Sequence, residues 1–118
     1  MPAVGFKTPP GAENNSPFHA LNDHTYCCGL NADVCAAKGE PDAKYTDKCL
    51  GWHQKRFSQR TADAKRMGIP LIISEFGSCM DTDSCYTEIK QVADTADEYL
   101  TGWAYWQFKT YRDVTSSA

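Results

Sequence analysis

The sequence has no long apolar run, no basic cluster and no low-complexity segment. A membrane helix needs about 18 consecutive apolar residues, so no transmembrane segment is expected. The 12 Lys and Arg residues against 15 Asp and Glu residues give a net charge of −3, unlike the electrostatic footprint of a nucleic-acid-binding protein. Because 42% of the 118 residues are apolar and 12% are aromatic, disordered and collagenous chains are excluded and one domain is expected.

Also lacking is the apolar stretch of about 7–15 residues that a secretory signal peptide carries, because the chain begins MPAVGFK. Six cysteines are nevertheless present, and an even number at this density is typical of disulfides formed in an oxidising compartment. We therefore expect an extracellular, lysosomal or other secretory protein whose N-terminus precedes this chain. The sequon Asn14-Asn15-Ser16 agrees with export.

The cysteine positions suggest two sets of disulfide partners. Cys79 and Cys85 would close a short polar loop and form the first expected disulfide. The other four share one stretch and are expected to pair among themselves: Cys27, Cys28, Cys35 and Cys49. The alternative is a zinc site in which His24 or His53 joins the thiols, although no C-x-x-C pair or regular ligand spacing is present.

The first third of the chain has little periodicity. Residues 1–17 carry prolines and glycines and are expected to be a loop or linker ahead of a domain over 18–118. A short strand is predicted within residues 20–26. The stretch 27–44 is predicted to be a long irregular excursion held by its cysteines.

Helical periodicity begins at Tyr45. The predicted helix is capped at its start by Thr46 or Asp47 and at its end by Gly68, and Pro70 prevents its continuation. The residues that repeat at helical spacing are Cys49, His53, Phe57, Ala64 and Met67.

Two continuously apolar runs follow, with a second helix between them. Residues 71–73 lack polar alternation and are predicted to form a strand buried on both faces, as in parallel sheets. The second helix is capped near Asp83 or Ser84. Its apolar face consists of Ile89, Val92, Ala93, Ala96, Tyr99 and Leu100. Residues 103–108 are predicted to be a third strand, again apolar on both faces.

The order strand, helix, strand, helix, strand predicts an α/β fold with a parallel sheet and right-handed crossovers. Strands buried on both faces need a further layer, or a closed barrel, opposite the helices. Two helices alone would leave apolar sheet edges exposed, which a stable native domain avoids. The pattern therefore indicates part of a larger fold.

Glu75 is the leading catalytic candidate, because it ends a buried parallel strand, where α/β barrels place catalytic groups. The alternative is a strand-end glutamate that is solvated or paired with an arginine. His24 and Tyr26 alternate by two and point to one side, where they could orient a carboxylate or bind sugar hydroxyls. Their alternative role is that of ordinary polar loop residues.

Trp103 and Trp106 are either core residues of the third strand or flat faces for a sugar ring. Three further charged residues are expected to be exposed to solvent: Asp23, Lys109 and Asp113.

Three motifs occur in order along the chain: His24-Thr25-Tyr26, then IISEFG over residues 72–77, then GWAYWQFK over residues 102–109. Together they resemble glycoside hydrolase family 5, the cellulase A family. The nearest likeness is to its endoglycoceramidase-like and glucosylceramidase-like members, which share the cysteine-bearing loop and an ending like Trp-x-Phe-Lys-x-Tyr-x-Asp. The resemblance covers residues 18–115.

The fold of that family is a (β/α)8 barrel, and the resemblance implies that this chain is its C-terminal portion, strands 6 to 8 with the intervening helices. It implies that Glu75 is the catalytic nucleophile and that His24 and Tyr26 are an active-site pair, with Tyr26 hydrogen-bonded near the nucleophile. It also implies that Trp106 is the platform under the sugar and that Lys109 binds substrate. No metal or organic cofactor is implied.

One family feature is missing from the chain. The acid/base glutamate of the family lies in an Asn-Glu step, and this sequence contains no Asn-Glu dipeptide. Retaining hydrolysis needs two carboxyl groups about 5–5.5 Å apart. The resemblance therefore implies a retaining hydrolase of β-glucosides, glucan or glycolipid, present here as a fragment that is inactive alone. The alternative from another class is a small secreted, disulfide-stapled carbohydrate-binding module without catalysis.

Overall fold

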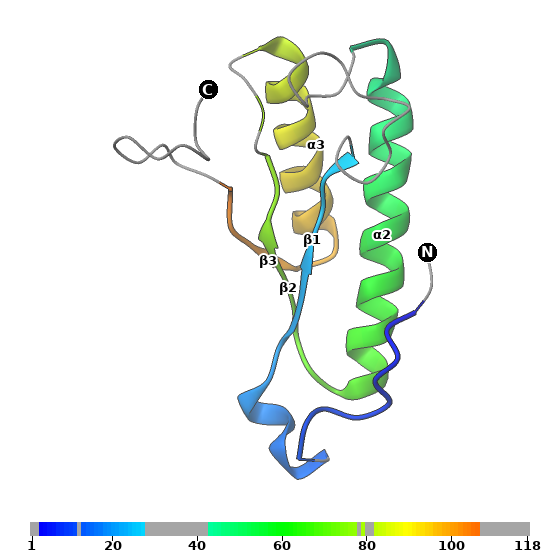
Figure 1. The fold of residues 1–118 in the computed structure, drawn as a ribbon, viewed down its shortest axis with the longest axis vertical. Helices are drawn as coiled ribbons and strands as arrows, with labels where there is room; N and C mark the ends of the chain where they lie inside the picture. Colours follow the sequence, from blue (N-terminus) through cyan, green and yellow to red (C-terminus); the bar gives the residue numbers. More distant parts are fainter. Residues whose placement is uncertain (1–2, 12, 28–42, 78, 80–81, 107–118) are drawn as a thin grey trace, which may run out of the picture.

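The computed structural model describes residues 3–11, 13–27, 43–77, 79 and 82–106. Strands and helices alternate in the predicted order: β1 (Leu21–His24), α2 (Thr46–Met67), β2 (Leu71–Glu75), α3 (Asp83–Glu98) and β3 (Gly102–Trp103). Two short 3-10 helices, η1 (Glu13–Phe18) and η4 (Ala43–Tyr45), precede β1 and α2. The strands form one parallel sheet in the order β1-β2-β3, which confirms the α/β prediction (Figure 1).

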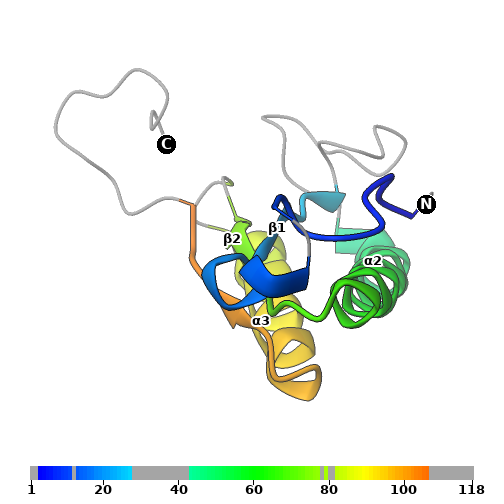
Figure 2. The same ribbon diagram turned by 90° about the horizontal axis from the view of Figure 1, so that it is seen from below.

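Both helices cover the same face of the sheet (Figure 2). Ile73 and Phe76 pack there against Phe57 of α2 and against Val92 and Ala96 of α3, and all five are fully buried. We call the opposite side of the sheet the open face. It is not covered within the described residues.

Ile72 is 37% exposed on the open face, so the prediction that this strand is buried on both faces is wrong for this chain. An unbroken run of apolar residues shows that both faces suit an apolar neighbour. It does not show which residues supply that neighbour.

Helix α2 has the predicted inward residues and the predicted end. The five residues at helical spacing are all buried, and Gly68 closes the helix in the left-handed region at φ 65°. The helix starts where the pattern predicted, but the predicted cap is wrong, because Tyr45 occupies the N-cap position without a side-chain capping hydrogen bond. The hydroxyl of Thr46 donates instead to the backbone oxygen of Ala43 at 2.8 Å, inside η4.

Helix α3 is capped by Thr82, whose hydroxyl accepts a hydrogen bond from the Cys85 backbone N–H at 3.2 Å. The predicted caps, Asp83 and Ser84, lie inside the helix instead, because the extended residue that precedes them is the one whose side chain reaches back. Val92 and Ala96 are buried as predicted. Leu100 is 95% exposed, because it leaves the helix with a positive φ of 50° and turns away from the apolar face.

The third strand is shorter than predicted. Only Gly102 and Trp103 pair with β2, and a single bridge joins Gly77 to Trp106 farther along. Trp103 and Trp106 are 46% and 40% exposed, so burial on both faces is again wrong. The rest of this predicted strand, residues 107–108, lies outside the described residues.

Within the segment expected to be a loop or linker, residues 13–17 lie in the 3-10 helix η1, which ends at Phe18. Both disulfide predictions that can be examined are confirmed: Cys79 pairs with Cys85, and Cys27 pairs with Cys49. Cys28 and Cys35 lie outside the described residues, as does most of the predicted excursion.

Candidate active site

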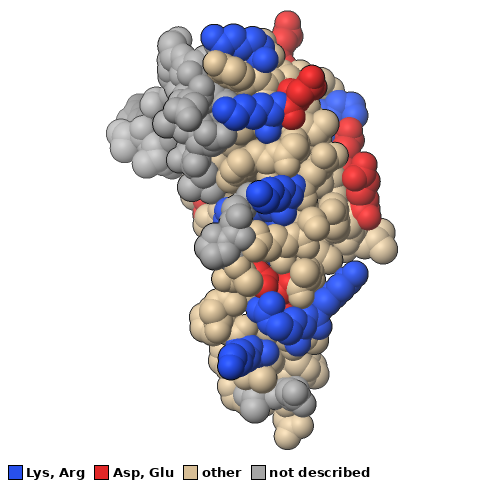
Figure 3. Space-filling view, turned by 90° about the vertical axis from the view of Figure 1, so that its right-hand side faces the viewer, with Lys and Arg blue, Asp and Glu red and all other residues tan. Residues whose placement is uncertain are grey.

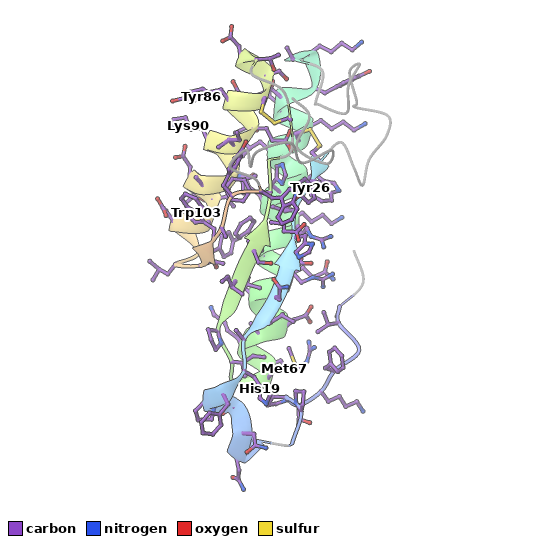
Figure 4. All side chains as sticks on the ribbon, turned by 60° about the vertical axis from the view of Figure 1, so that its left-hand side comes forward. His19, Tyr26, Met67, Tyr86, Lys90 and Trp103 are labelled. Carbon is purple, nitrogen blue, oxygen red and sulfur yellow. A yellow bond between two sulfur atoms is a disulfide. The ribbon has the colours of Figure 1, made fainter. Side chains whose placement is uncertain are left out.

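The carboxylate of Glu75 meets two side chains at the C-terminal edge of the sheet. The Tyr26 hydroxyl donates to Glu75 Oε2 at 3.2 Å, and His24 Nδ1 lies 3.3 Å from the same oxygen. The Glu75 side chain remains 29% exposed, so solvent or a ligand can reach it. Figure 4 shows Tyr26 just beyond the end of β1. The structure thus brings the three predicted residues together.

An irregularity in the pairing of β1 with β2 determines which way Glu75 faces. Asp23 pairs with Ile73 and His24 pairs with Glu75, so Ser74 is an extra residue in β2. In a regular strand, Glu75 would share the helix-covered face with Ile73. With the extra residue, Ser74 and Glu75 both contact side chains of β1 on the open face, Asn22 and His24 respectively.

The environment of Tyr26 keeps its hydroxyl protonated. Burial raises the pKa of Tyr26 well above its usual value, and the negative charge of Glu75 and the hydrogen bond to it raise the pKa further. Tyr26 is therefore a hydrogen-bond donor throughout the neutral range. Its hydrogen bond orients the Glu75 carboxylate.

A glycine brings an aromatic segment next to this edge. Gly77 has φ 102°, and a β-carbon there would lie 2.3 Å from Tyr105 Cε2 and 2.8 Å from the Trp106 oxygen. The backbone N–H of Trp106 donates to the Phe76 oxygen at 2.8 Å. The predicted platform residue is thus held beside the segment that follows Glu75, with its side chain partly exposed. Lys109 lies outside the described residues.

Sequence reasoning missed a buried polar network behind the site. His53 of α2 lies between Thr25 and Glu88, 2.7 Å from the Thr25 hydroxyl and 3.1 Å from Glu88 Oε1. The periodicity of α2 predicted that His53 is buried, but not what satisfies it. One signal could have indicated the partner, because a buried imidazole needs polar partners. The inward-facing glutamate of α3, Glu88, is such a partner.

Asp23 was predicted to be solvated, and this is wrong. It lies on the helix-covered face of β1 and accepts hydrogen bonds from Arg56 and Arg60 of α2. A charged residue in a short strand takes this position because two guanidinium groups compensate for its burial.

The described residues contain no group of three or more His, Cys, Asp or Glu side chains that could hold a metal ion. The described cysteines are all in the two disulfides, so the zinc alternative finds no support among them. Within the same residues, no helix is long and apolar enough to cross a membrane.

A parallel βα array with a hydrogen-bonded carboxylate at its C-terminal edge defines an α/β protein of the kind that forms enzyme barrels. The family model of cellulase (glycosyl hydrolase family 5) matches residues 7–112. This chain belongs to glycosyl hydrolase family 5, whose fold is a (β/α)8 barrel and whose members are glycosidases in general. No curated protein and no solved protein structure matches the chain.

Proposed function

We propose that this chain carries the nucleophile of a retaining β-glycoside hydrolase. The observation that supports the proposal is the Glu75 carboxylate, which is held by Tyr26 and His24 on the open face of the sheet. In this proposal β1, β2 and β3 are the sixth, seventh and eighth strands of a barrel, and the subgroup is the endoglycoceramidase-like one.

In the proposed reaction, Glu75 attacks the anomeric carbon and displaces the aglycone oxygen to form a glycosyl-enzyme ester. Water then attacks the same carbon and releases the sugar and the free carboxylate. Tyr26 orients the Glu75 carboxylate before attack, and Trp106 and Lys109 bind the sugar. A second carboxyl group protonates the leaving oxygen, and we place it outside these 118 residues because the chain has no Asn-Glu step.

The proposed substrate is a β-glucoside, a glucan or a glycolipid, and the proposed location is extracellular or lysosomal. The two disulfides support the location, because such bonds persist in oxidising compartments.

The test is labelling of the complete protein with a 2-deoxy-2-fluoro glucoside, followed by peptide mass spectrometry. We expect the label on Glu75, and we expect Glu75→Gln to lower turnover by roughly 10³-fold or more. Glu98→Gln, at the exposed end of α3, is the matched control and should react like the natural protein. A label on another carboxyl group would contradict the assignment.

A carbohydrate-binding module without catalysis is the second candidate. The exposure of Trp103 and Trp106 favours it, because exposed aromatic faces pack against sugar rings. This candidate predicts that the 118-residue chain binds glucan or glycolipid in a pull-down assay and that no carboxyl group is labelled in the complete protein.

A further inference from the structure

The residues that follow β1 alternate between two environments. His24 and Tyr26 contact the Glu75 carboxylate, whereas Thr25 and Cys27 are fully buried on the other side of the chain. The backbone N–H of Thr25 donates to the backbone oxygen of Glu75 at 3.0 Å. This short segment therefore fixes where the two partners of the carboxylate lie.

Two helices hold the buried side of this segment through one histidine and one glutamate. His53 Nδ1 lies 2.7 Å from the Thr25 hydroxyl, and His53 Nε2 lies 3.1 Å from Glu88 Oε1. The same Glu88 oxygen accepts the backbone N–H of Cys27 at 3.3 Å. The Cys27–Cys49 disulfide adds a covalent link from this segment to α2.

The chemistry of the groups determines the direction of the hydrogen bond between His53 and Glu88. A carboxylate only accepts, so the Nε2–H of His53 donates to Glu88, and Nδ1 on the other side of the ring pairs with the Thr25 hydroxyl, which can both donate and accept. A buried imidazole or carboxylate without partners would be strongly destabilising, and here each satisfies the other. The arrangement has one low-energy geometry, because a ring between two buried partners cannot turn without losing both.

We propose that His53 and Glu88 are positioning residues for the reaction at Glu75. Through Thr25 and Cys27 they hold the backbone that directs Tyr26 and His24 toward the carboxylate. The inference rests on the proposed function, because it assigns these residues to the nucleophile of that reaction.

The test compares Thr25→Val with Thr25→Ser in the complete protein. Valine keeps the size of threonine and removes its hydroxyl, whereas serine keeps the hydroxyl. We expect Thr25→Val to slow labelling of Glu75 by the fluoro-glucoside on the order of tenfold with little change in KM, because small displacements of reacting groups are costly. Thr25→Ser should restore most of the labelling rate.

The split between kcat and KM supplies a readout that a merely structural role would not move. The side chains that contact Glu75 among the described residues, His24 and Tyr26, are unchanged in Thr25→Val. A displaced carboxylate slows the chemical step but not substrate binding, so kcat per folded molecule should fall while KM stays the same.

The size-preserving Glu88→Gln gives a second comparison, in which the amide replaces the charge that orients His53. We expect slower labelling and the same fall in kcat without a change in KM. If Thr25→Val and Glu88→Gln lower only the melting temperature, with labelling rate and kcat per folded molecule unchanged, the positioning role is wrong. Absence of any label on Glu75 in the natural protein would instead contradict the proposed function itself.

Discussion

The Tyr26 hydroxyl is a permanent donor to Glu75, because burial and the neighbouring negative charge raise its pKa well above the neutral range. The same hydrogen bond fixes the position of the carboxylate oxygen that accepts it. One phenol thus acts on Glu75 over the whole pH range in which a glycosidase works.

Tyr26→Phe should therefore lower kcat/KM by about tenfold, because the carboxylate loses the hydrogen bond that orients it. The measurement is the steady-state kinetics of the complete protein. Tyr86→Phe removes an exposed hydroxyl on α3 (Figure 4) and should leave kcat/KM unchanged. An unchanged kcat/KM in Tyr26→Phe would exclude the proposed role.

At the scale of residues, the sequence predicts groups that lie on adjacent strand ends. Strand ends and period-2 alternation placed His24 and Tyr26 on one side of the first strand and Glu75 at the end of the next, and the family resemblance implied that Tyr26 lies near Glu75. Asp23 and Glu88 could not be placed, because their partners lie on helices more than 30 residues away in the sequence. The identity of a charged residue says that it needs a partner, but not where the partner comes from.

Helix α2 also anchors the N-terminal segment. Asp63 is buried and accepts hydrogen bonds from Arg60, Arg66 and the backbone N–H of Val4, and Arg66 donates in turn to the backbone oxygens of Val4 and Phe6. Lysine and arginine side chains follow one another along the surface on the right-hand side of Figure 1, as Figure 3 shows. The buried carboxylate of Asp63 balances part of this charge.

Burial opposes the ionisation of Asp63, but the hydrogen bonds from Val4, Arg66 and Arg60 outweigh it and lower the pKa of Asp63 below its usual value of 3.8. A lowered pKa in the folded state stabilises the protein above the pKa of the unfolded chain. This stabilisation is lost as the pH falls through the lower, folded value.

Asp63→Asn should therefore reduce the free energy of unfolding by about 2 kcal/mol at pH 7, and by less near pH 3. Urea denaturation of the complete protein at the two pH values measures both numbers. Asp94→Asn, which removes an exposed ion pair with Lys90, is the control and should have no measurable effect. Equal destabilisation by Asp63→Asn at both pH values would show that its charge is not the stabilising feature.

At the scale of elements, periodicity predicted α2, α3 and β1, and composition predicted where α2 ends. Neither periodicity nor composition predicted the N-caps. The backbone conformation, and not capping propensity alone, determines that Tyr45 and Thr82 occupy these positions. Periodicity also overestimated β3, where the chain leaves regular pairing and returns only at the Gly77–Trp106 bridge.

Among the described residues, both helices cover one face of the sheet and leave the other face open. Ile72 on the open face is 37% exposed, and Trp103, which pairs with Ile73 at the edge strand β3, is 46% exposed. Strands β1 and β3 are the edges of the described sheet. Parallel sheets are stable when both faces are covered. This asymmetry supports the proposal that further strands of a barrel complete the fold.

The 118-residue chain expressed alone should therefore bind an apolar fluorescent dye and unfold over a broad temperature range. Calorimetry and dye fluorescence measure the two properties, with the complete protein as the reference. A sharp, cooperative transition without dye binding would favour the carbohydrate-binding module instead.

At this largest scale, three short motifs predicted the family, and the family model over residues 7–112 confirms it. The helix–strand alternation predicted the parallel sheet. The sequence did not predict which face of the sheet the helices leave open. An apolar strand can be covered on either face, so its composition does not distinguish the two.

Because β2 has one extra residue, the face toward which the Glu75 carboxylate points depends on the number of residues in the strand. A substitution at Ser74 changes a side chain, whereas the loss of one codon between Ile73 and Glu75 would restore regular alternation. Glu75 would then turn toward the helices, and every residue of the site would still be present in the sequence. A single deletion in this strand would therefore dismantle the site without removing any of its residues, so the length of β2 has to be compared between related chains as well as the identity of residue 75.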